Sequence, residues 1–162
     1  MGMALFLYSI SEQQAGALAA DPDLVTQLLD DDMPDVAHTD LDKAWYGIHY
    51  LLTGSEWEGE PPLNFLLQGG AMLAEEDEES EPAPRLLRPD EVAAVSGALA
   101  DVSADQLRER YDPQKMRALD IYPAIWDDGP DALDYCLDNY AELQAFIAEA
   151  ARQQHAVLIF MG

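Results

Sequence analysis

The sequence predicts an α+β fold: one predominantly helical domain with a small sheet that contains the N- and C-terminal strands. Two apolar runs, over residues 3–9 and residues 156–161, are typical of buried strands and lie at opposite ends of the chain. Between them, most segments carry apolar residues at helical spacing and begin at a capping residue or a proline. The length of 162 residues fits a single domain, so we assign residues 1–162 to one unit.

Three helices are expected in the first third of the chain. Ser11 can cap a short helix over residues 12–20, and Asp21-Pro22-Asp23 places a capping side chain before a proline at a first helical position. Thr39 and the aspartate three residues later resemble a capping box. A helix with one apolar face is therefore predicted to begin at Thr39 and to end at Gly54.

The middle of the chain is expected to alternate short helices with turns. Pro61 and Pro62 precede a short helix that ends at Gly69-Gly70. Residues 85–87 are predicted to form a short extended segment. Three further helices are predicted to begin at a proline or a capping side chain, at Pro89, Ser103 and Asp112.

The last third is predicted to contain an extended segment, a long helix and the terminal strand. Ile121-Tyr122-Pro123 must be extended because Tyr122 precedes a proline. A helix over residues 131–153 carries apolar residues at spacings of three and four, which predicts a buried stripe of Leu133, Leu137, Tyr140, Leu143, Ile147 and Ala150. Residues 156–161 have a β-branched centre, which favours a buried strand.

Acidic residues outnumber basic ones by 32 to 8, and the formal net charge is −24. Residues 1–84 hold 18 acidic residues and one basic residue, with dense runs at Asp30-Asp31-Asp32 and from Glu75 onward. The second run leads into prolines, which predicts an acidic flexible loop over residues 75–84. Such a surface repels phosphate backbones and anionic headgroups, so we expect neither nucleic acid nor a membrane as a partner.

The sequence carries no signature of a metal, cofactor or catalytic site. The spaced aspartates of a calcium loop are missing, as are phosphate loops, dinucleotide fingerprints and nucleophile elbows. Cys136 is the only cysteine and lies near the apolar stripe of the long helix, where we expect it to pack as a small hydrophobic residue. We therefore predict no metal site and no cofactor. Because signal-peptide features are missing and no apolar run reaches the length of a membrane helix, the expected location is the cytoplasm.

One predicted helix face combines polar and aromatic side chains that could form a pocket wall. From Asp42 to Thr53, a carboxylate, an indole, an imidazole and a hydroxyl follow one another at spacings of three and four. A rigid corner around Pro123 carries two aromatic side chains that could rim the same pocket. The candidate residues are Asp42, Trp45, His49, Thr53, Tyr122 and Trp126. The alternative is a buried aromatic stripe in which Trp45 and His49 donate hydrogen bonds to nearby carbonyl groups.

Several of these segments together resemble one known family. They are the N-terminal Met1-Gly2-Met3, the Asp-Lys-x-Trp-x-x-x-His pattern from Asp42 followed by Leu-Thr-Gly, the Ile121-Tyr122-Pro123 segment with Trp126, and the apolar C-terminal run. In this combination the chain is similar to the YfbM-like bacterial proteins over essentially its whole length. The resemblance implies a single cytoplasmic α+β domain without an established activity, and it supplies no catalytic residues. Against that family pattern, residues 75–84 look like an acidic insertion.

Two functions and one neutral explanation fit these observations. The first is a non-catalytic interaction protein whose acidity attracts a basic partner, such as a secreted nuclease toxin, in a salt-dependent association. The second is a small-molecule-binding domain or weakly marked enzyme in which His49 transfers a proton, since an unperturbed imidazole has a pKa near ~6.5. The third is that the acidity reflects host adaptation or solubility. The pattern leaves the oligomeric state open.

Overall fold

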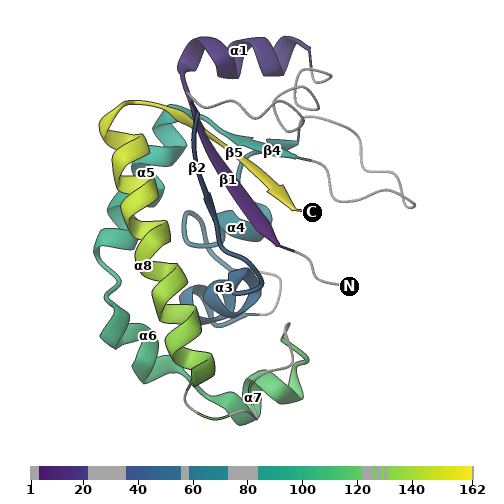
Figure 1. Ribbon diagram of the computed structural model, residues 1–162, viewed down its shortest axis with the longest axis vertical. Coiled ribbons are helices and arrows are strands. Elements are labelled where there is room, and N and C mark those ends of the chain that lie inside the picture. Colours follow the sequence, from purple (N-terminus) through teal and green to yellow (C-terminus); the bar gives the residue numbers. More distant parts are fainter. Residues whose placement is uncertain are drawn as a thin grey trace, which may run out of the picture.

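The computed structural model describes residues 4–21, 36–55, 59–72, 84–121, 126, 129 and 131–161. The elements are, in chain order, β1 (Leu5–Ile10), α1 (Glu12–Ala20), β2 (Ala37–Asp40), α3 (Trp45–Thr53), α4 (Phe65–Gln68), β3 (Ala71–Met72), β4 (Arg85–Leu87), α5 (Pro89–Ala100), α6 (Ala104–Arg110), α7 (Pro113–Ala118), α8 (Asp131–Arg152) and β5 (Ala156–Met161). Helices dominate, and both terminal strands belong to one sheet (Figure 1), so the predicted α+β class is confirmed.

The sheet has five strands in the order β2-β1-β5-β4-β3, and every described pairing is antiparallel. The first and last strands are neighbours over their full length, with Leu5 opposite Met161 and Ile10 opposite Ala156. Because the two strands run in opposite directions, the beginning of β1 lies beside the end of β5 (Figure 1).

Helices cover both faces of the sheet. One face carries Leu7, Leu87 and Ile159, which join a large core with residues of α3, α5 and α8. The other face carries Ile10 and Leu158, which pack against the two buried residues of α1. In Figure 1, α1 crosses the top of the sheet while α8 runs down beside it. Burial on both faces is most complete in β5, where residues 156–159 are all buried, and it explains why this strand is a continuous apolar run and not an alternating one.

Several helix boundaries follow the local chemistry that predicts them. Ser11 and Ser103 each accept a hydrogen bond from the backbone N–H three residues later, and the glutamine at that position bonds back to the capping backbone. Asp112 caps α7 in the same way by accepting from the Lys115 backbone N–H. α3 ends at Gly54, whose φ of 75° lies in the left-handed region that favours glycine. These predicted boundaries are confirmed.

The predicted start of α3 is wrong. Thr39 lies in β2, where it pairs with Leu7 of β1, and α3 begins six residues later at Trp45. The polar residues that resemble a capping box form a turn instead, because Asp40 Oδ1 accepts a hydrogen bond from Asp42 N at 2.6 Å and Asp42 has a φ of 49°. Because the backbone of Thr39 is paired with β1, its side chain cannot cap a helix that begins there. Tertiary structure thus overrides the local sequence pattern.

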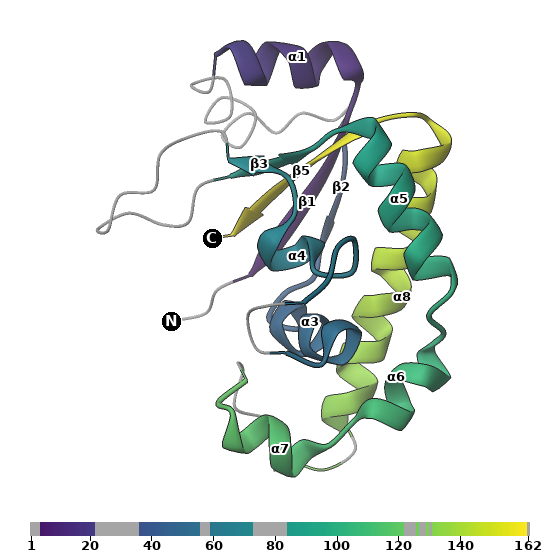
Figure 2. The ribbon, with the colours of Figure 1, turned by 180° about the vertical axis from the view of Figure 1, so that it is seen from behind.

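Helix α3 is buried all round, whereas the sequence predicts one apolar face. Eight of its nine residues are buried, and α4, α6 and α8 contact it. Figure 2 shows it inside the helical layer, with α4 above and α7 below. The packing around it is tight at Gly47, where an added Cβ would lie 2.8 Å from Trp126 Cη2 and 3.0 Å from Cys136 Sγ. α3 is therefore the centre of the core and not a surface helix.

Some predictions fall outside the described residues, and one strand has no sequence signal. Outside lie most of the helix expected from Asp21-Pro22-Asp23, the acidic loop apart from its last residue, and Tyr122 with Pro123. β3 is two residues long and pairs with β4. Such a short strand has too few residues for any periodicity to predict it.

Candidate functional site

The candidate pocket residues of α3 lie in the core. His49 has 0% exposed surface and Trp45 has 4%. Thr53 is half-buried at the last turn and donates a hydrogen bond to the carbonyl oxygen of His49 at 2.9 Å. A group that transfers a proton to a substrate must lie within hydrogen-bond reach of it. In this conformation the imidazole of His49 is out of reach of any solute.

Trp126 joins the same core from the segment before α8. Its side chain is buried, and the indole Nε1 donates a hydrogen bond to the carbonyl oxygen of Ile121 at 2.6 Å. The far end of its ring faces Gly47 on α3. The remaining aromatic candidate, Tyr122, lies outside the described residues. The structure thus packs Trp126 against α3 in the interior and does not place it at the rim of an opening.

Asp42 lies apart from this core, in a surface contact with α8. The phenol of Tyr135 donates a hydrogen bond to Asp42 Oδ2 at 2.5 Å and accepts one from the backbone N–H of Lys43 at 3.0 Å. Burial, followed by the hydrogen bond to Asp42, raises the pKa of Tyr135 to about 12. The phenol therefore keeps its proton at neutral pH and fixes the turn before α3 to α8.

Cys136 is buried beside Gly47 in the contact between α3 and α8. Burial raises the pKa of its thiol to about 12. Because the thiolate and not the thiol is the nucleophile, this side chain is unreactive at neutral pH. Cys136 therefore packs as a small hydrophobic residue, as the sequence predicts.

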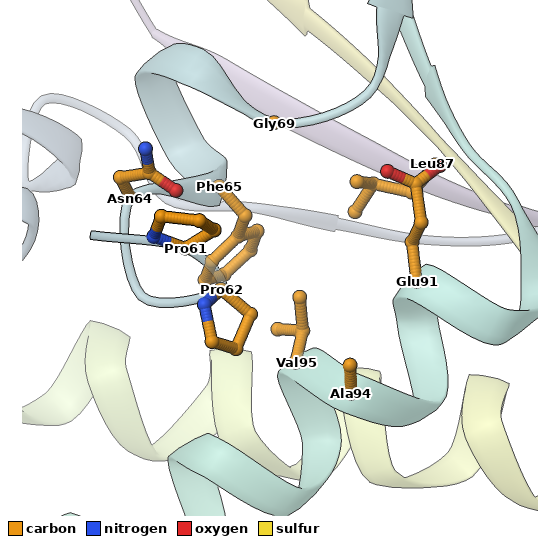
Figure 3. A pocket seen from close by; sticks show the side chains of 9 residues that line it. All are labelled: Pro61, Pro62, Asn64, Phe65, Gly69, Leu87, Glu91, Ala94 and Val95. Atoms are coloured by element: carbon orange, nitrogen blue, oxygen red, sulfur yellow. The ribbon is translucent and has the colours of Figure 1, made fainter. Parts of the chain in front are cut away.

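A cavity of about 280 Å³ lies between α4, β4 and α5, away from the predicted pocket residues (Figure 3). Its lining is mostly apolar and consists of Pro61, Pro62, Asn64, Phe65, Gly69, Leu87, Glu91, Ala94 and Val95. The sequence pattern marks several of these residues as helix boundaries and gives no sign that they meet. They belong to two segments, residues 61–69 and residues 87–95, which the antiparallel pairing of β3 with β4 brings together.

The described arginines are largely engaged within the protein. Arg85 Nη1 donates to the carbonyl oxygens of Phe65 and Gly69 at 3.0 and 2.7 Å, at the end of α4. Arg110 Nη1 donates to the carbonyl oxygens of Leu51 and Leu52 at 3.0 and 3.3 Å, at the end of α3. Both guanidinium groups thus satisfy helix C-termini, where a positive charge is favourable. Arg88 and Arg152 form ion pairs with nearby carboxylates.

A row of carboxylates runs along the outer side of α8. Asp131, Asp134, Asp138 and Glu142 are exposed and follow one another at spacings of three, four and four residues. These spacings place the side chains on one helix face, over about 16 Å at 1.5 Å rise per residue. Among the described residues, none of the four forms an ion pair. The row therefore presents uncompensated negative charge to solvent.

Metal ligands and membrane spans were sought in the same part of the chain. The described ranges contain no group of three or more histidine, cysteine or acidic residues placed to hold a metal ion. No helix within those ranges combines the length and apolar character needed to cross a bilayer.

Comparison with known proteins gives a family and a fold. The family model described as "Domain of unknown function (DUF1877)" matches residues 1–160. Among solved structures, the chain is similar to YfbM from Escherichia coli, a protein of unknown function, with a TM-score of 0.76 and 18% sequence identity. The match covers 98% of this chain and 99% of that chain, and at this identity it establishes the fold alone. No curated protein matched the sequence.

Proposed function

The chain belongs to the DUF1877 family of domains of unknown function, and from that premise we propose that it is a non-catalytic protein that binds a basic partner protein. The partner we favour is a cationic protein such as a nuclease toxin, neutralised in the bacterial cytoplasm. The observation that carries this proposal is the uncompensated charge: a net −24 with an exposed carboxylate row on α8.

The imbalance between acidic and basic residues supports this proposal. Arg85 and Arg110 are already counted among the eight basic residues, so the net charge of −24 is what remains after every positive side chain is included. A field of one sign speeds the encounter with an oppositely charged protein and makes association depend on salt. The same field works against phosphate-bearing partners, which is why a protein partner is preferred to nucleic acid.

The burial of the candidate catalytic groups supports a function without catalysis. His49 has no exposed surface, and the thiol of Cys136 is buried with a raised pKa. A small-molecule site or enzyme that uses the imidazole would need α3 to open, which would break the centre of the core. A binding surface on the outer side of α8 needs no such change.

The proposal is tested by isolating the partner and measuring how salt and charge affect binding. The full chain is used as bait in a lysate of its source organism at low ionic strength, and each retained basic protein is then purified. We expect one such protein to bind saturably, with an association rate that falls steeply between about 50 mM and 500 mM NaCl because the attraction is screened.

Two charge reversals locate the binding surface. Asp138→Lys alters the middle of the α8 row, whereas Glu12→Lys makes the same change in net charge at an exposed position on α1, across the sheet. We expect the first to slow association by roughly threefold or more and the second to change it little. If no purified basic protein binds saturably, or if the two variants behave alike with it, the proposal fails.

A further inference from the structure

The cavity between α4, β4 and α5 has an apolar floor and, among the described residues of its lining, a single ionisable side chain. Phe65, Leu87 and Val95 are buried residues that line it. Figure 3 shows Phe65 together with the two prolines on one side and Glu91 beside Leu87 on the other. A volume of about 280 Å³ is just below the ~300–1,000 Å³ of typical ligand pockets, so the cavity suits a small ligand.

The polar groups of the lining favour a positively charged ligand. Glu91 Oε1 accepts a hydrogen bond from Arg88 N at 3.1 Å and lies 3.4 Å from Arg88 Nε. Within the described ranges, both contacts to the Glu91 carboxylate are made to Oε1. Oε2 therefore remains available to accept a hydrogen bond from a ligand. Asn64 Nδ2 donates to the carbonyl oxygen of Gly59 at 3.0 Å, so the amide offers Oδ1 as a second acceptor. Pro61 and Pro62 contribute no N–H donor.

We propose that this cavity binds a small organic amine, with its apolar body against Phe65 and Val95 and its ammonium group at the carboxylate of Glu91. An anion would be repelled by the carboxylate, which is the charged group of the described lining, and a neutral apolar molecule would leave Glu91 Oε2 without a new partner. The ring of Phe65, on the side opposite Glu91 in Figure 3, offers an apolar face to the body of the ligand. This inference does not depend on binding of a basic protein at α8, and either one can fail without the other.

The test uses four small probes of matched shape or charge. Benzylammonium has both the apolar body and the cation, benzyl alcohol has the body without charge, benzoate reverses the charge, and methylammonium lacks the body. We expect benzylammonium to shift the NMR methyl signals of Leu87 and Val95 saturably, with a Kd in about the millimolar range for so small a ligand. Benzyl alcohol should bind several-fold more weakly, and the other two should leave these methyl signals unchanged.

Matched variants separate a built site from general attraction to an acidic protein. Glu91→Gln removes the charge but keeps an acceptor for Arg88 N, whereas Glu109→Gln makes the same change at an exposed position of α6 outside the lining. We expect Glu91→Gln to weaken benzylammonium binding by about threefold or more and Glu109→Gln to leave it unchanged.

A second pair of variants tests the shape of the cavity. Ala94→Phe fills the cavity from an exposed position of α5, and Ala93→Phe places the same ring on a position outside the lining. We expect the first to abolish the shifts at Leu87 and Val95 and the second to preserve them. Methyl shifts that respond equally to methylammonium, equal affinities for Glu91→Gln and Glu109→Gln, or binding that persists in Ala94→Phe would each overturn the proposal.

Discussion

The tight crossing of α3 and α8 makes a strong prediction about Gly47. In Gly47→Ala the new Cβ would lie 2.8 Å from Trp126 Cη2, whereas carbon atoms in contact prefer ~3.5–4.0 Å, so the ring must move by about 0.7 Å. The indole cannot retreat freely, because it is buried and its Nε1 is bound to the carbonyl oxygen of Ile121. Overpacking of this kind costs about 1–3 kcal/mol, against about 1 kcal/mol gained from alanine in a helix.

The matched control is Gly97→Ala in α5, an exposed position where an added Cβ meets nothing within 4 Å. We expect Gly47→Ala to lower the free energy of unfolding by about 1 kcal/mol and Gly97→Ala to raise it by about 0.5–1 kcal/mol. The two variants should therefore differ by about 5 °C in Tm, measured by circular dichroism and checked by urea titration. Equal stability would refute the packing of Trp126 and Cys136 over α3, and with it the burial of His49.

Three further predictions concern charge. Arg110→Ala should lower the free energy of unfolding by about 1–2 kcal/mol, because two carbonyl oxygens of α3 lose a charged donor. The control Arg108→Ala, on the same helix, should change it by less than about 0.5 kcal/mol in the same urea titration. Burial raises the pKa of three groups to about 12: Tyr135, Cys136 and Tyr140. Because folding favours their protonated forms, the free energy of unfolding should be highest below about pH 9 and fall as pH rises towards 12. Tyr135→Phe should make this fall shallower. Urea midpoints that stay constant from about pH 8 to 11 would contradict the prediction. Asp138→Asn removes the repulsion between this carboxylate and those four residues before and after it, and should raise Tm by about 1–2 °C at low salt. Because salt screens this repulsion, the gain should vanish in about 0.5 M NaCl. An unchanged Tm at low salt would show that the carboxylates of the row do not repel one another measurably.

Helix ends were predictable because their chemistry is local. The side chain of Ser11 or Ser103 caps its helix through residues three positions away, and Gly54 supplies the left-handed turn in which α3 ends. The terminal strands were predictable for a related reason. A strand that is buried on both faces needs a continuous apolar run, which the sequence displays directly. Helix ends and terminal strands can both be predicted from the sequence because neither prediction requires knowledge of contacts between distant segments.

The errors and omissions share the opposite cause. Thr39 carries a good capping side chain, but pairing with β1 places it in an edge strand. The polar stripe that includes His49 indicates a pocket wall if α3 faces solvent, yet α3 is surrounded by other helices. The cavity near Glu91 was not predicted because its walls come from two segments that meet through β3 and β4. Contacts between distant segments decided each of these cases.

The charges divide into a group that the fold requires and a group that it does not. Arg85 and Arg110 bind carbonyl oxygens at the ends of α4 and α3, so their replacement would leave those carbonyl groups without a charged donor. The carboxylates of the α8 row make no ion pair in the described part of the chain, and they stand close enough to repel one another. The fold therefore uses these two arginines, and it also uses some carboxylates such as Asp112 at the start of α7, but no described ion pair involves the α8 row. Asp131 and Asp134 lie in the first turn of α8, where a negative charge is favourable, whereas Asp138 and Glu142 lie beyond it. Selection outside the fold explains these two residues, either for a basic partner or for an acidic surface in general. Comparing Asp138→Lys with Glu12→Lys separates these causes, because a general requirement for acidity would not depend on which side of the sheet loses its charge.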